Sequence, residues 1–429
     1  MKRTLIKNIG TLACILPADK LRLCGQEMEH VETLHDAWLL VEDGKIKDFG
    51  SNGSFPYDSI DETLACIDAQ GGTVLPSFCD SHTHLVYADS REQEFVDKIQ
   101  GLSYAEIARR GGGILNSADR LHDLSEDELY RQAMRRVNEI IYKGTGAIEI
   151  KSGYGLNTDD ELKMLRVIRR IRETSPVTVR STFLGAHSVG RAYVGRQADY
   201  VDLIINEMIP EVGRQGLADF IDVFCDEGFF TPEETARILE AGAQYGMRPK
   251  IHGQELADSG GVEVALAHRA LSVDHLESMT ERDIRLIREA YDRDGSHSDD
   301  LLMPTALPGT SFFLNMPFAP ARQIIASGLP LATASDYNPG STPSGDMKFV
   351  VSLACIKMRL LPEEAINAAT INTAAAMGIS RTHGSITRGK VANLIITEPI
   401  PSLAYIPYAY TQPIVSRIVL NGDVVKRPE

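Results

Sequence analysis

Eight runs of apolar and β-branched residues alternate with helical patterns through the middle of this chain. This order favours a parallel sheet, because consecutive parallel strands are joined by crossovers that are usually helices. One helical pattern covers residues 160–173, and another begins at Pro232 and is followed by Gly246, as helix ends prefer. The eight strand-like runs are GGTVLPSFCDSHTH (71–84), TGAIEIKSGY (145–154), TVRSTFLGAH (178–187), DFIDVFCDEG (219–228), RPKIHGQE (248–255), ALSVDHLE (270–277), DDLLMPTA (299–306) and LPLATASDYN (329–338).

Eight strand–helix units of this length predict an α/β fold, a closed (β/α)8 TIM barrel, over residues 70–384. The run at 299–306 is the weakest, because the stretch DRDGSHSDDLLMP (292–304) is more polar than a buried strand should be. A doubly wound open sheet is the competing fold, since both folds alternate strands and helices.

Both ends of the chain are rich in strand patterns. The pair Asp-Gly at 43–44 lies between AWLLVE and KIKDFG, and the pair Asn-Gly at 421–422 lies between IVSRIVL and DVVK. Such pairs between strand-like runs are the strongest local sign of a β-hairpin. If the barrel occupies the middle, we expect residues 1–69 and 385–429 to pair into one small β-sandwich domain.

The composition excludes several kinds of partner. Lys and Arg number 44 against 59 Asp and Glu, and this net charge of −15 repels nucleic acid and anionic membranes. We expect neither a membrane span nor a signal peptide, because no long apolar run occurs and Lys7 and Asn8 interrupt the N-terminal apolar patch. The six cysteines lack paired spacing, which indicates reduced thiols and a cytoplasmic protein.

Histidines gather at the ends of the predicted strands. In a barrel the C-terminal ends of all strands meet at one mouth, where active sites form. Two residues at positions i and i+2 of a strand point to the same face, so the first two histidines should both point into the mouth. The residues at these ends are His82 and His84 on the first strand, His187 on the third, His252 on the fifth, His275 on the sixth and Asp336 on the eighth.

These positions predict a metal centre. An H-x-H pair alone is a weak sign, but imidazoles with a carboxylate at matching strand ends suit zinc or iron. We therefore expect one divalent or trivalent metal ion, zinc or iron, bound by His82, His84, His252 and Asp336. Such an ion lowers the pKa of a coordinated water from about 16 to about 7, which predicts a hydrolase that uses hydroxide.

Three further residues near the predicted mouth have specific interpretations. Glu255 lies three residues after His252 and is placed to exchange protons with a bound substrate. Asp80 is expected to hydrogen-bond a ligand histidine. Lys151 is the one lysine that ends a predicted strand, and we interpret it as structural. The fourth strand ends in CDEG (225–228) without a lysine, which favours a single metal ion.

Several motifs resemble those of the amidohydrolase superfamily and, within it, the imidazolonepropionase family. They are PSFCDSHTHL (76–85), KIHGQE (250–255), VDHLE (273–277), SDYNPGS (335–341) and the more discriminating KSGYGL (151–156). The resemblance covers nearly the whole chain. It departs at Ser335, where a threonine is expected, and at Asn393, where an acid is expected. It implies hydrolytic ring opening of 4-imidazolone-5-propanoate to N-formimidoyl-L-glutamate by a homodimeric enzyme with a small-molecule substrate.

The same resemblance implies roles for individual residues. The metal ligands of the family match His82, His84, His252 and Asp336. The acid–base pair matches Glu255 and His275, and the sequence leaves open which of these two or Asp336 is the general base. The substrate-binding residues of the family match Arg91, Tyr154, His187, Glu255, Asn338, Gly340 and Ser341.

The chemistry of two of these residues agrees with a carboxylated substrate. Arg91 offers a planar fork that binds a propionate through two hydrogen bonds, and Tyr154 is a neutral donor. Two other functions compete with this prediction. Another amidohydrolase, a deaminase or iminohydrolase acting on a related carboxylated nitrogen compound, would share the metal centre. A metal-containing barrel that acts as a binding or regulatory module would have no turnover.

Overall fold

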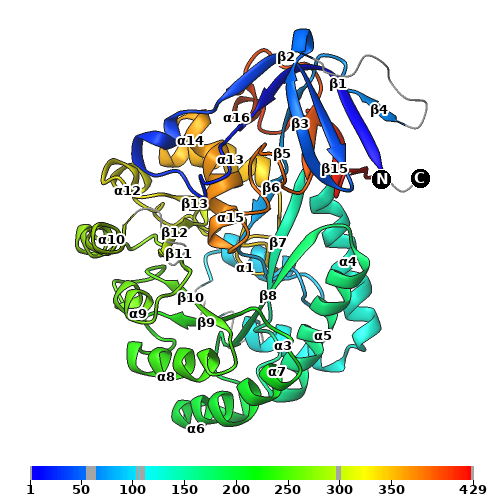
Figure 1. The fold of residues 1–429 in the computed structure, drawn as a ribbon. Helices are drawn as coiled ribbons and strands as arrows, with labels where there is room; N and C mark the ends of the chain where they lie inside the picture. The colour runs from blue at the N-terminus through cyan, green and yellow to red at the C-terminus, as the bar shows by residue number, and fades with distance from the viewer. Residues whose placement is uncertain (1, 55–63, 103–105, 107–111, 296–300, 427–429) are drawn as a thin grey trace.

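The computed structural model of the protein describes residues 2–54, 64–102, 106, 112–295 and 301–426. The chain forms a barrel of parallel strands surrounded by helices, with a second sheet at the top of the view in Figure 1. The predicted α/β barrel with a separate sheet from the termini is confirmed.

Among the described residues the barrel contains eight parallel strands, and each strand pairs with the next one along the chain. The first and last strands meet through a parallel bridge between Thr83 and Tyr337. The backbone N–H of Asp336 donates to His82 O at 2.9 Å across the same seam, so an open doubly wound sheet is excluded. The strands are β6 (Phe78–Asp80), β7 (Thr145–Lys151), β8 (Thr178–Ala186), β9 (Phe220–Cys225), β10 (Arg248–Gly253), β11 (Ser272–His275), β12 (Met303–Ala306) and β13 (Ala332–Thr333).

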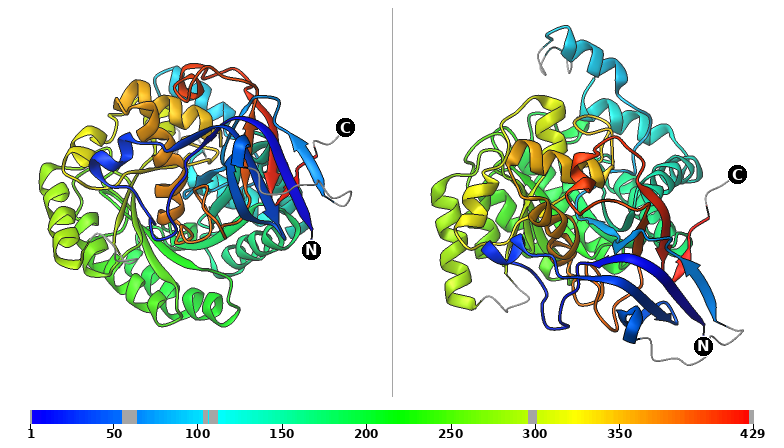
Figure 2. Two further views of the ribbon diagram at one scale, coloured as in Figure 1. Left: turned by 45° about the horizontal axis from the view of Figure 1, so that its top comes forward. Right: turned by 90° about the horizontal axis from the view of Figure 1, so that it is seen from above.

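Helices surround the barrel (Figure 2). The two helices predicted from their patterns are α5 (Thr158–Thr174) and α8 (Pro232–Ala243). A capping box starts α8, in which Thr231 Oγ1 accepts from Glu234 N at 3.2 Å and the Glu234 carboxylate accepts from Thr231 N. Within the described ranges, every helix is too short or too polar to span a lipid bilayer.

The other described α-helices are α1 (Glu92–Ile99), α3 (Ile114–Asp123), α4 (Glu126–Tyr142), α6 (Gln197–Leu203), α7 (Ile209–Arg214), α9 (Gly261–Ala267), α10 (Glu281–Asp294), α11 (Pro308–Leu314), α12 (Ala321–Ala326), α13 (Met347–Met358), α14 (Pro362–Asn367), α15 (Thr373–Ala376) and α16 (Tyr405–Tyr408). Short 3-10 helices are η1 (Gly25–Glu29), η2 (Asn52–Ser54) and η3 (Arg191–Tyr193), and short π-helical segments are η4 (Ile204–Met208) and η5 (Ala368–Asn372).

Both ends of the chain contribute strands to the second sheet, and these blue and red strands lie together in Figure 1. The two predicted hairpins are confirmed, because Glu42 pairs with Lys45 and Leu420 pairs with Asp423 around turns with positive φ. The strands are β1 (Arg3–Ala13), β2 (Thr33–Glu42), β3 (Lys45–Ser51), β4 (Ala65–Asp68), β5 (Thr73–Pro76), β14 (Leu394–Thr397), β15 (Val415–Leu420) and β16 (Asp423–Val424).

The terminal sheet curls around an apolar core of its own. Ile46 N on β3 donates to Lys390 O at 2.8 Å, and Gly389 N donates back to Ile46 O at 2.8 Å. The edge strand β3 therefore returns to the segment that precedes β14. The curl packs apolar side chains from both chain ends against one another, among them Ile6, Leu39, Val74, Leu394 and Val419.

The run predicted as the first barrel strand, residues 71–84, is divided between the two sheets. Ser77 N donates to Asn393 O at 2.9 Å in the terminal sheet, whereas Phe78 N donates to Gly144 O at 2.9 Å beside the barrel strand β7. The backbone thus changes partners directly after Pro76 and Ser77, and β5 belongs to the terminal sheet. The boundary that we predicted between the two domains stays a prediction.

Candidate active site

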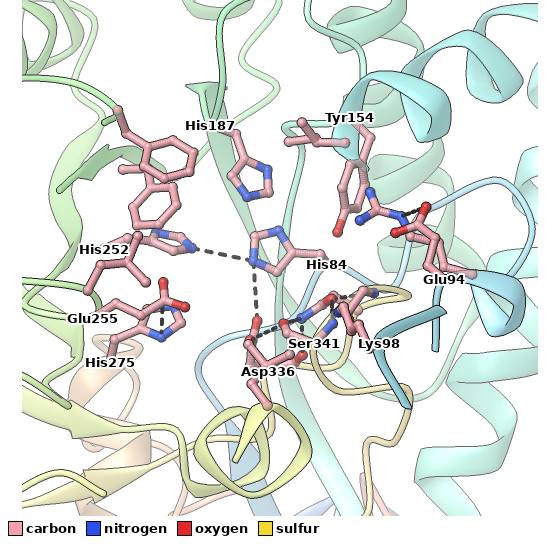
Figure 3. A pocket seen from close by; sticks show the side chains of 18 residues that line it. His84, Glu94, Lys98, Tyr154, His187, His252, Glu255, His275, Asp336 and Ser341 are labelled. Atoms are coloured by element: carbon pink, nitrogen blue, oxygen red, sulfur yellow. Dashed lines mark hydrogen bonds and ion pairs between the residues drawn. The ribbon is translucent and has the colours of Figure 1, made fainter. Parts of the chain in front are cut away.

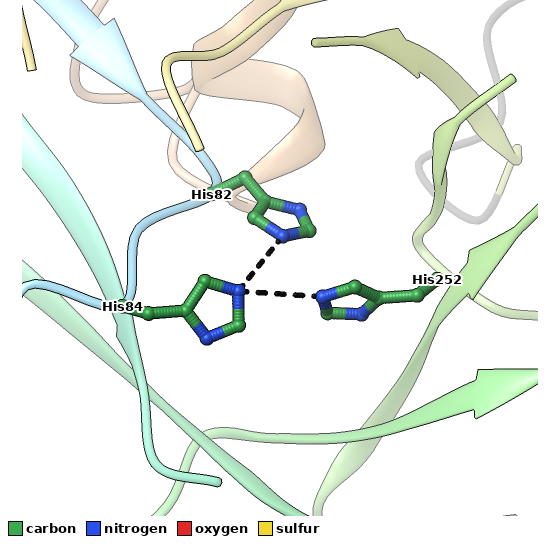
Figure 4. Close-up of side chains that lie close together, drawn as sticks. All are labelled: His82, His84 and His252. Atoms are coloured by element: carbon green, nitrogen blue, oxygen red, sulfur yellow. Dashed lines mark hydrogen bonds between the residues drawn. The ribbon is translucent and has the colours of Figure 1, made fainter. Parts of the chain in front are cut away.

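Three imidazoles meet at the C-terminal end of the barrel strands (Figure 4). His82 and His84 follow β6, and His252 lies near the end of β10. Nε2 of His84 lies 3.2 Å from Nε2 of His82 and 3.4 Å from Nε2 of His252. Ligands at about 2.0–2.1 Å from a tetrahedral zinc ion are about 3.3 Å apart, so these separations fit a metal centre.

Asp336 adds a carboxylate to this group. Its Oδ1 lies 3.6 Å from His82 Nε2 and 3.5 Å from His84 Nε2. Its Oδ2 accepts from Thr310 Oγ1 at 2.6 Å and from Ser341 Oγ at 3.2 Å, which fixes the carboxylate in place. The structure therefore brings together all four side chains that the sequence predicted as metal ligands.

Two buried carboxylates contact the outer nitrogens of these imidazoles. Asp274 Oδ2 lies 2.7 Å from His82 Nδ1, and Asp222 Oδ2 lies 2.9 Å from His252 Nδ1. A carboxylate that accepts the Nδ1 proton leaves the Nε2 lone pair for a metal. Burial and the positive charge of Lys151 hold the pKa of His82 well below its usual value, so this imidazole is neutral.

Lys151 lies among these carboxylates. Its Nζ is 2.7 Å from Glu149 Oε1, 2.7 Å from Asp222 Oδ2 and 3.8 Å from Asp274 Oδ2. The Nζ of Lys250 lies 2.5 Å from Glu149 Oε2, and all of these groups are fully buried. Although burial opposes the charged form, the carboxylates raise the pKa of Lys151. These contacts agree with its interpretation as a structural residue.

Asp80 hydrogen-bonds the ligand histidine His82 as predicted, through the backbone N–H of that residue, but its closer partner is Ser335. Its carboxylate accepts from Ser335 N at 3.0 Å, from Ser335 Oγ at 2.5 Å and from the backbone N–H of His82 at 3.5 Å. Asp80 therefore joins the strand before the histidines to the residue before Asp336. It holds backbone in place and does not contact an imidazole nitrogen of a ligand.

A pocket of about 460 Å³ opens beside the imidazoles (Figure 3). Its walls are partly apolar, with Phe224, Phe229, Leu256, Leu314 and Ile114 among them. The sequence-predicted substrate and acid–base residues all line it, namely Arg91, Tyr154, His187, Glu255, His275, Asp336, Asn338, Gly340 and Ser341.

Arg91 lies at one end of this pocket, immediately before α1. Its Nε donates to Ser117 Oγ at 2.8 Å and lies 3.9 Å from Glu94 Oε1. Its Cζ lies 5.7 Å from the ring centre of Tyr154. Its Nη2 is buried and has no hydrogen-bond partner within the described ranges. Because buried donors in native proteins are nearly always paired, this nitrogen is available to an acceptor on a ligand.

The loop after β13 connects the arginine to the metal ligands. Asn338 Oδ1 accepts from the backbone N–H groups of Gly340 and Ser341, both at 2.8 Å. A Cβ at Gly340 would lie 2.6 Å from Arg91 Nη1, so only glycine allows this approach. The loop therefore brings the guanidinium group against the segment that carries Asp336.

His275 ends β11 and faces two carboxyl groups. Its Nδ1 lies 3.6 Å from Glu255 Oε2 and 3.7 Å from Glu277 Oε2, and Ser311 Oγ donates to Glu277 Oε1 at 2.8 Å. Burial and the Glu277 carboxyl raise the pKa of Glu255 well above its usual value. Burial raises the pKa of Glu277 to about 8. Carboxyl groups that stay protonated near neutral pH are suited to donate protons.

His187 follows β8 and lies across the pocket from Asp336 in Figure 3. Its Nδ1 lies 3.1 Å from the carbonyl oxygen of Gly153, and its ring stacks on that of His84 with centroids 5.0 Å apart. Burial and the neighbouring His252 lower the pKa of His187 to about 3, so the ring is neutral. With the Nδ1 proton donated to Gly153, Nε2 is left as an acceptor.

Comparison with known proteins identifies the family of the chain. A model of the amidohydrolase family matches residues 73–425. The chain is 51% identical over 421 residues to the imidazolonepropionase of Christiangramia forsetii, with 98% of this chain and 99% of that protein covered. It is 38% identical over 427 residues to the imidazolonepropionase of Geobacillus kaustophilus, with coverages of 99% and 98%. The chain belongs to the imidazolonepropionase family of amidohydrolases.

Solved structures share the fold of this amidohydrolase. E. coli guanine deaminase has a TM-score of 0.73 at 14% identity, covering 100% of both chains. A. niger ochratoxinase has a TM-score of 0.68 at 18% identity, covering 100% of this chain and 96% of that chain. At these identities the likeness concerns the fold alone. Membership of the imidazolonepropionase family makes the protein a hydrolase.

The sequence did not lead us to predict three residues that contact this imidazolonepropionase-family site. Asp222 and Asp274 lie within predicted strands, and Glu277 ends the predicted run that contains His275. A carboxylate inside an apolar strand run was the available signal for the two aspartates, because a charge buried in a barrel needs a partner. The partners themselves come from other strands, so the contacts appear only when the barrel closes.

Proposed function

We propose that the protein hydrolyses 4-imidazolone-5-propanoate to N-formimidoyl-L-glutamate. The observation that carries this proposal is the unpartnered Nη2 of Arg91 in the same pocket as the three imidazoles. A ligand with a carboxylate tail and a polar ring fits both ends of such a pocket. Membership of the imidazolonepropionase family supports the same substrate.

We propose one metal ion, zinc or iron, with His82, His84, His252 and Asp336 as its ligands. Three imidazole nitrogens and one carboxylate oxygen suit these metals, and the separations between the donor atoms support the assignment. When bound, the ion polarises a carbonyl group and lowers the pKa of a coordinated water.

Arg91 binds the propionate in this proposal. Its planar guanidinium group offers two parallel N–H donors to the two carboxylate oxygens, and Tyr154 contributes a neutral hydroxyl donor. The loop from Asn338 to Ser341 and the imidazole of His187 line the space between the propionate and the ligand imidazoles. These contacts hold the ring of the substrate toward the imidazoles.

The reaction adds the oxygen of water to the lactam carbonyl carbon and breaks the bond from that carbon to the ring nitrogen. His275 accepts the proton that the attacking water loses, and Asp336 shares that proton through a hydrogen bond to the water. Glu255, whose pKa burial raises, donates a proton to the departing nitrogen. The Nδ1 of His275 lies 3.6 Å from Glu255 Oε2, close enough to return the proton through a small movement.

An assay of the purified protein with synthetic 4-imidazolone-5-propanoate tests the proposal. We expect the ring absorbance to fall and mass spectrometry to find N-formimidoyl-L-glutamate. A deaminase or iminohydrolase would instead act on a related compound with release of ammonia, and a regulatory barrel would turn over nothing. Absence of ring opening by the metal-loaded protein would contradict the proposed function.

We also propose that the enzyme is a homodimer and works in the cytoplasm. The dimer follows from the family resemblance. All six cysteines are free thiols in the structure, which supports a reducing compartment. Size-exclusion chromatography with light scattering should give twice the chain mass of 47.1 kDa, and a mass of one chain would contradict the dimer.

A further inference from the structure

A second cation, Lys98, lines the pocket at the same end as Arg91. Lys98 is the penultimate residue of α1, and its side chain is half-buried. Its Nζ donates to the carbonyl oxygen of Gly340 at 2.9 Å. Figure 3 shows the lysine beside Ser341, which follows Gly340 in the loop after β13.

The charges at this end of the pocket do not balance. Arg91 has Glu94 as a neighbour, since Nε and Oε1 are 3.9 Å apart, and Glu94 is held in place by the backbone N–H of Gly113 at 2.8 Å. Among the described residues no carboxylate lies within ion-pair distance of Lys98 Nζ. One positive charge is therefore left without a counterion beside the guanidinium group.

The ammonium group also has unused donors. A lysine ammonium carries three N–H donors, and in the described part of the chain Lys98 uses one of them, on Gly340 O. The guanidinium group of Arg91 packs against the same glycine, because a Cβ there would meet Nη1 at 2.6 Å. Both cations therefore adjoin Gly340, one through its carbonyl oxygen and one through its α-carbon.

We propose that Lys98 is a second cation that recognises the carboxylate of the substrate, and that the carbonyl group of Gly340 positions its ammonium group. This inference rests on the proposed function, because that function supplies the carboxylate. The planar fork of Arg91 fixes the orientation of the carboxylate, and Lys98 adds a point charge beside it. Lys98 thereby makes the pocket select an anionic tail over a neutral tail of the same shape.

A purely structural role for Lys98 makes a different prediction. The contact with Gly340 O ties α1 to the loop after β13, so loss of the lysine would disturb Arg91 as well. That disturbance would weaken binding of every substrate, whatever charge its tail carries. Loss of a charge that touches the carboxylate weakens binding of the anionic substrate alone.

The experiment compares two substrates, imidazolone propanoate and its neutral propanamide analogue, with wild type and three variants of Lys98. Lys98→Met and Lys98→Gln remove the charge, and the glutamine amide still offers a donor to Gly340 O. We expect both to raise KM for the propanoate about tenfold with kcat nearly unchanged. KM for the propanamide should change less than about twofold, and Lys98→Arg should stay within about threefold of wild type for both substrates.

Lys143→Met is the matched control, because Lys143 pairs with Glu139 on the surface and does not line this pocket. Its kinetic constants should equal those of the wild type. An equal rise of KM for both substrates in Lys98→Met would overturn the inference in favour of a structural role. Unchanged KM in Lys98→Met, with normal turnover by the wild type, would overturn the inference alone. No turnover of the propanoate by the wild type would overturn the proposed function together with the inference.

Discussion

Asp274 Oδ2 lies 2.7 Å from Nδ1 of His82, although the two residues are 192 positions apart in the chain. The contact determines which imidazole nitrogen donates a proton to the carboxylate and which one faces the other two histidines. The same carboxylate oxygen lies 3.8 Å from Lys151 Nζ and 3.7 Å from Lys250 Nζ. The proposed metal ligands are thus connected to a network of buried charges inside the barrel.

The first prediction concerns this contact. Asp274→Asn should weaken metal binding by about 10–100-fold, because the amide accepts the Nδ1 proton of His82 less strongly and orients the ring less well. Competition with a chelator of known affinity measures the effect. Asp48→Asn is the control, since Asp48 pairs with Arg388 in the terminal sheet. Equal affinities of the two variants would show that the contact does not support the metal centre.

Lys151 should contribute strongly to stability. In Lys151→Met the carboxylates of Glu149 and Asp222 stay buried without their cation, so we expect a loss of about 3–5 kcal/mol in the free energy of unfolding. Lys143→Met, which breaks a surface pair with Glu139, should cost less than about 1 kcal/mol. Urea unfolding curves of both variants provide the comparison. Similar losses of unfolding free energy in the two variants would mean that the buried charge network around Lys151 does not stabilise the fold.

Arg91 should control substrate affinity. Arg91→Ala removes the guanidinium donors at the end of the pocket, so we expect KM for imidazolone propanoate to rise by about 10–100-fold with little change in kcat. Arg191→Ala, which removes a surface pair with Asp119, should leave both constants unchanged. Steady-state kinetics at several substrate concentrations separates the two constants. An unchanged KM in Arg91→Ala would point to a different substrate.

Glu255 should affect the chemical step. The amide in Glu255→Gln has no acidic proton to give to the departing nitrogen, so kcat should fall by about 10²–10⁴-fold. The metal content should remain that of the wild type, because Glu255 is not one of the proposed ligands. Glu126→Gln removes a carboxylate that pairs with Arg166 on the surface and should keep full activity. Full activity of Glu255→Gln would exclude Glu255 as the proton donor.

His383 should make stability depend on pH. Its ring is buried, Nε2 lies 3.0 Å from Thr178 Oγ1, and burial with the positive charges of Lys390 and Arg180 lowers its pKa to about 4. Between pH 6.5 and the native pKa of about 4, His383 binds a proton in the unfolded chain but not in the native protein. The stability that the neutral histidine contributes is therefore present above pH 6.5 and is lost as the pH falls toward 4.

The measurement is the free energy of unfolding of wild type and His383→Gln at pH 6.5 and pH 5. The wild type should lose about 2 kcal/mol more than the variant between these pH values. The proposed metal ligands are the same in both proteins. Their contribution to the pH dependence of the free energy of unfolding therefore cancels when the wild type and the variant are compared. Parallel losses in the two proteins would show that His383 does not titrate as described.

The strands and the histidines were predictable because both depend on local sequence patterns. Apolar and β-branched runs marked the strands of the barrel, and the spacing of His82 and His84 placed both imidazoles on one face. The common mouth of a barrel then predicted that His252 and Asp336 would lie near them. These features could be predicted from the strand pattern alone, because the C-terminal ends of the parallel strands meet at one mouth of the barrel.

The features of the fold and the site that were not predicted depend on contacts between segments that are distant in the sequence. The orienting roles of Asp222 and Asp274 follow from the strands beside them, and the closest partner of Asp80 is Ser335 on the far side of the barrel seam. The division of the run 71–84 between two sheets falls at Pro76 and Ser77, which interrupt the apolar pattern but do not show which sheet each side joins. Packing between segments decides these features, and no spacing along the chain records it.

The most direct test of the proposed metal centre is a metal titration of the metal-free protein. Elemental analysis measures the bound metal, and hydrolysis of imidazolone propanoate measures the activity. If His82, His84, His252 and Asp336 hold one catalytic ion, activity should rise in proportion to bound zinc or iron and reach its maximum at about one equivalent per chain. Full activity without metal, or activity that rises only with a second equivalent of metal, would contradict a single catalytic ion bound by these four side chains.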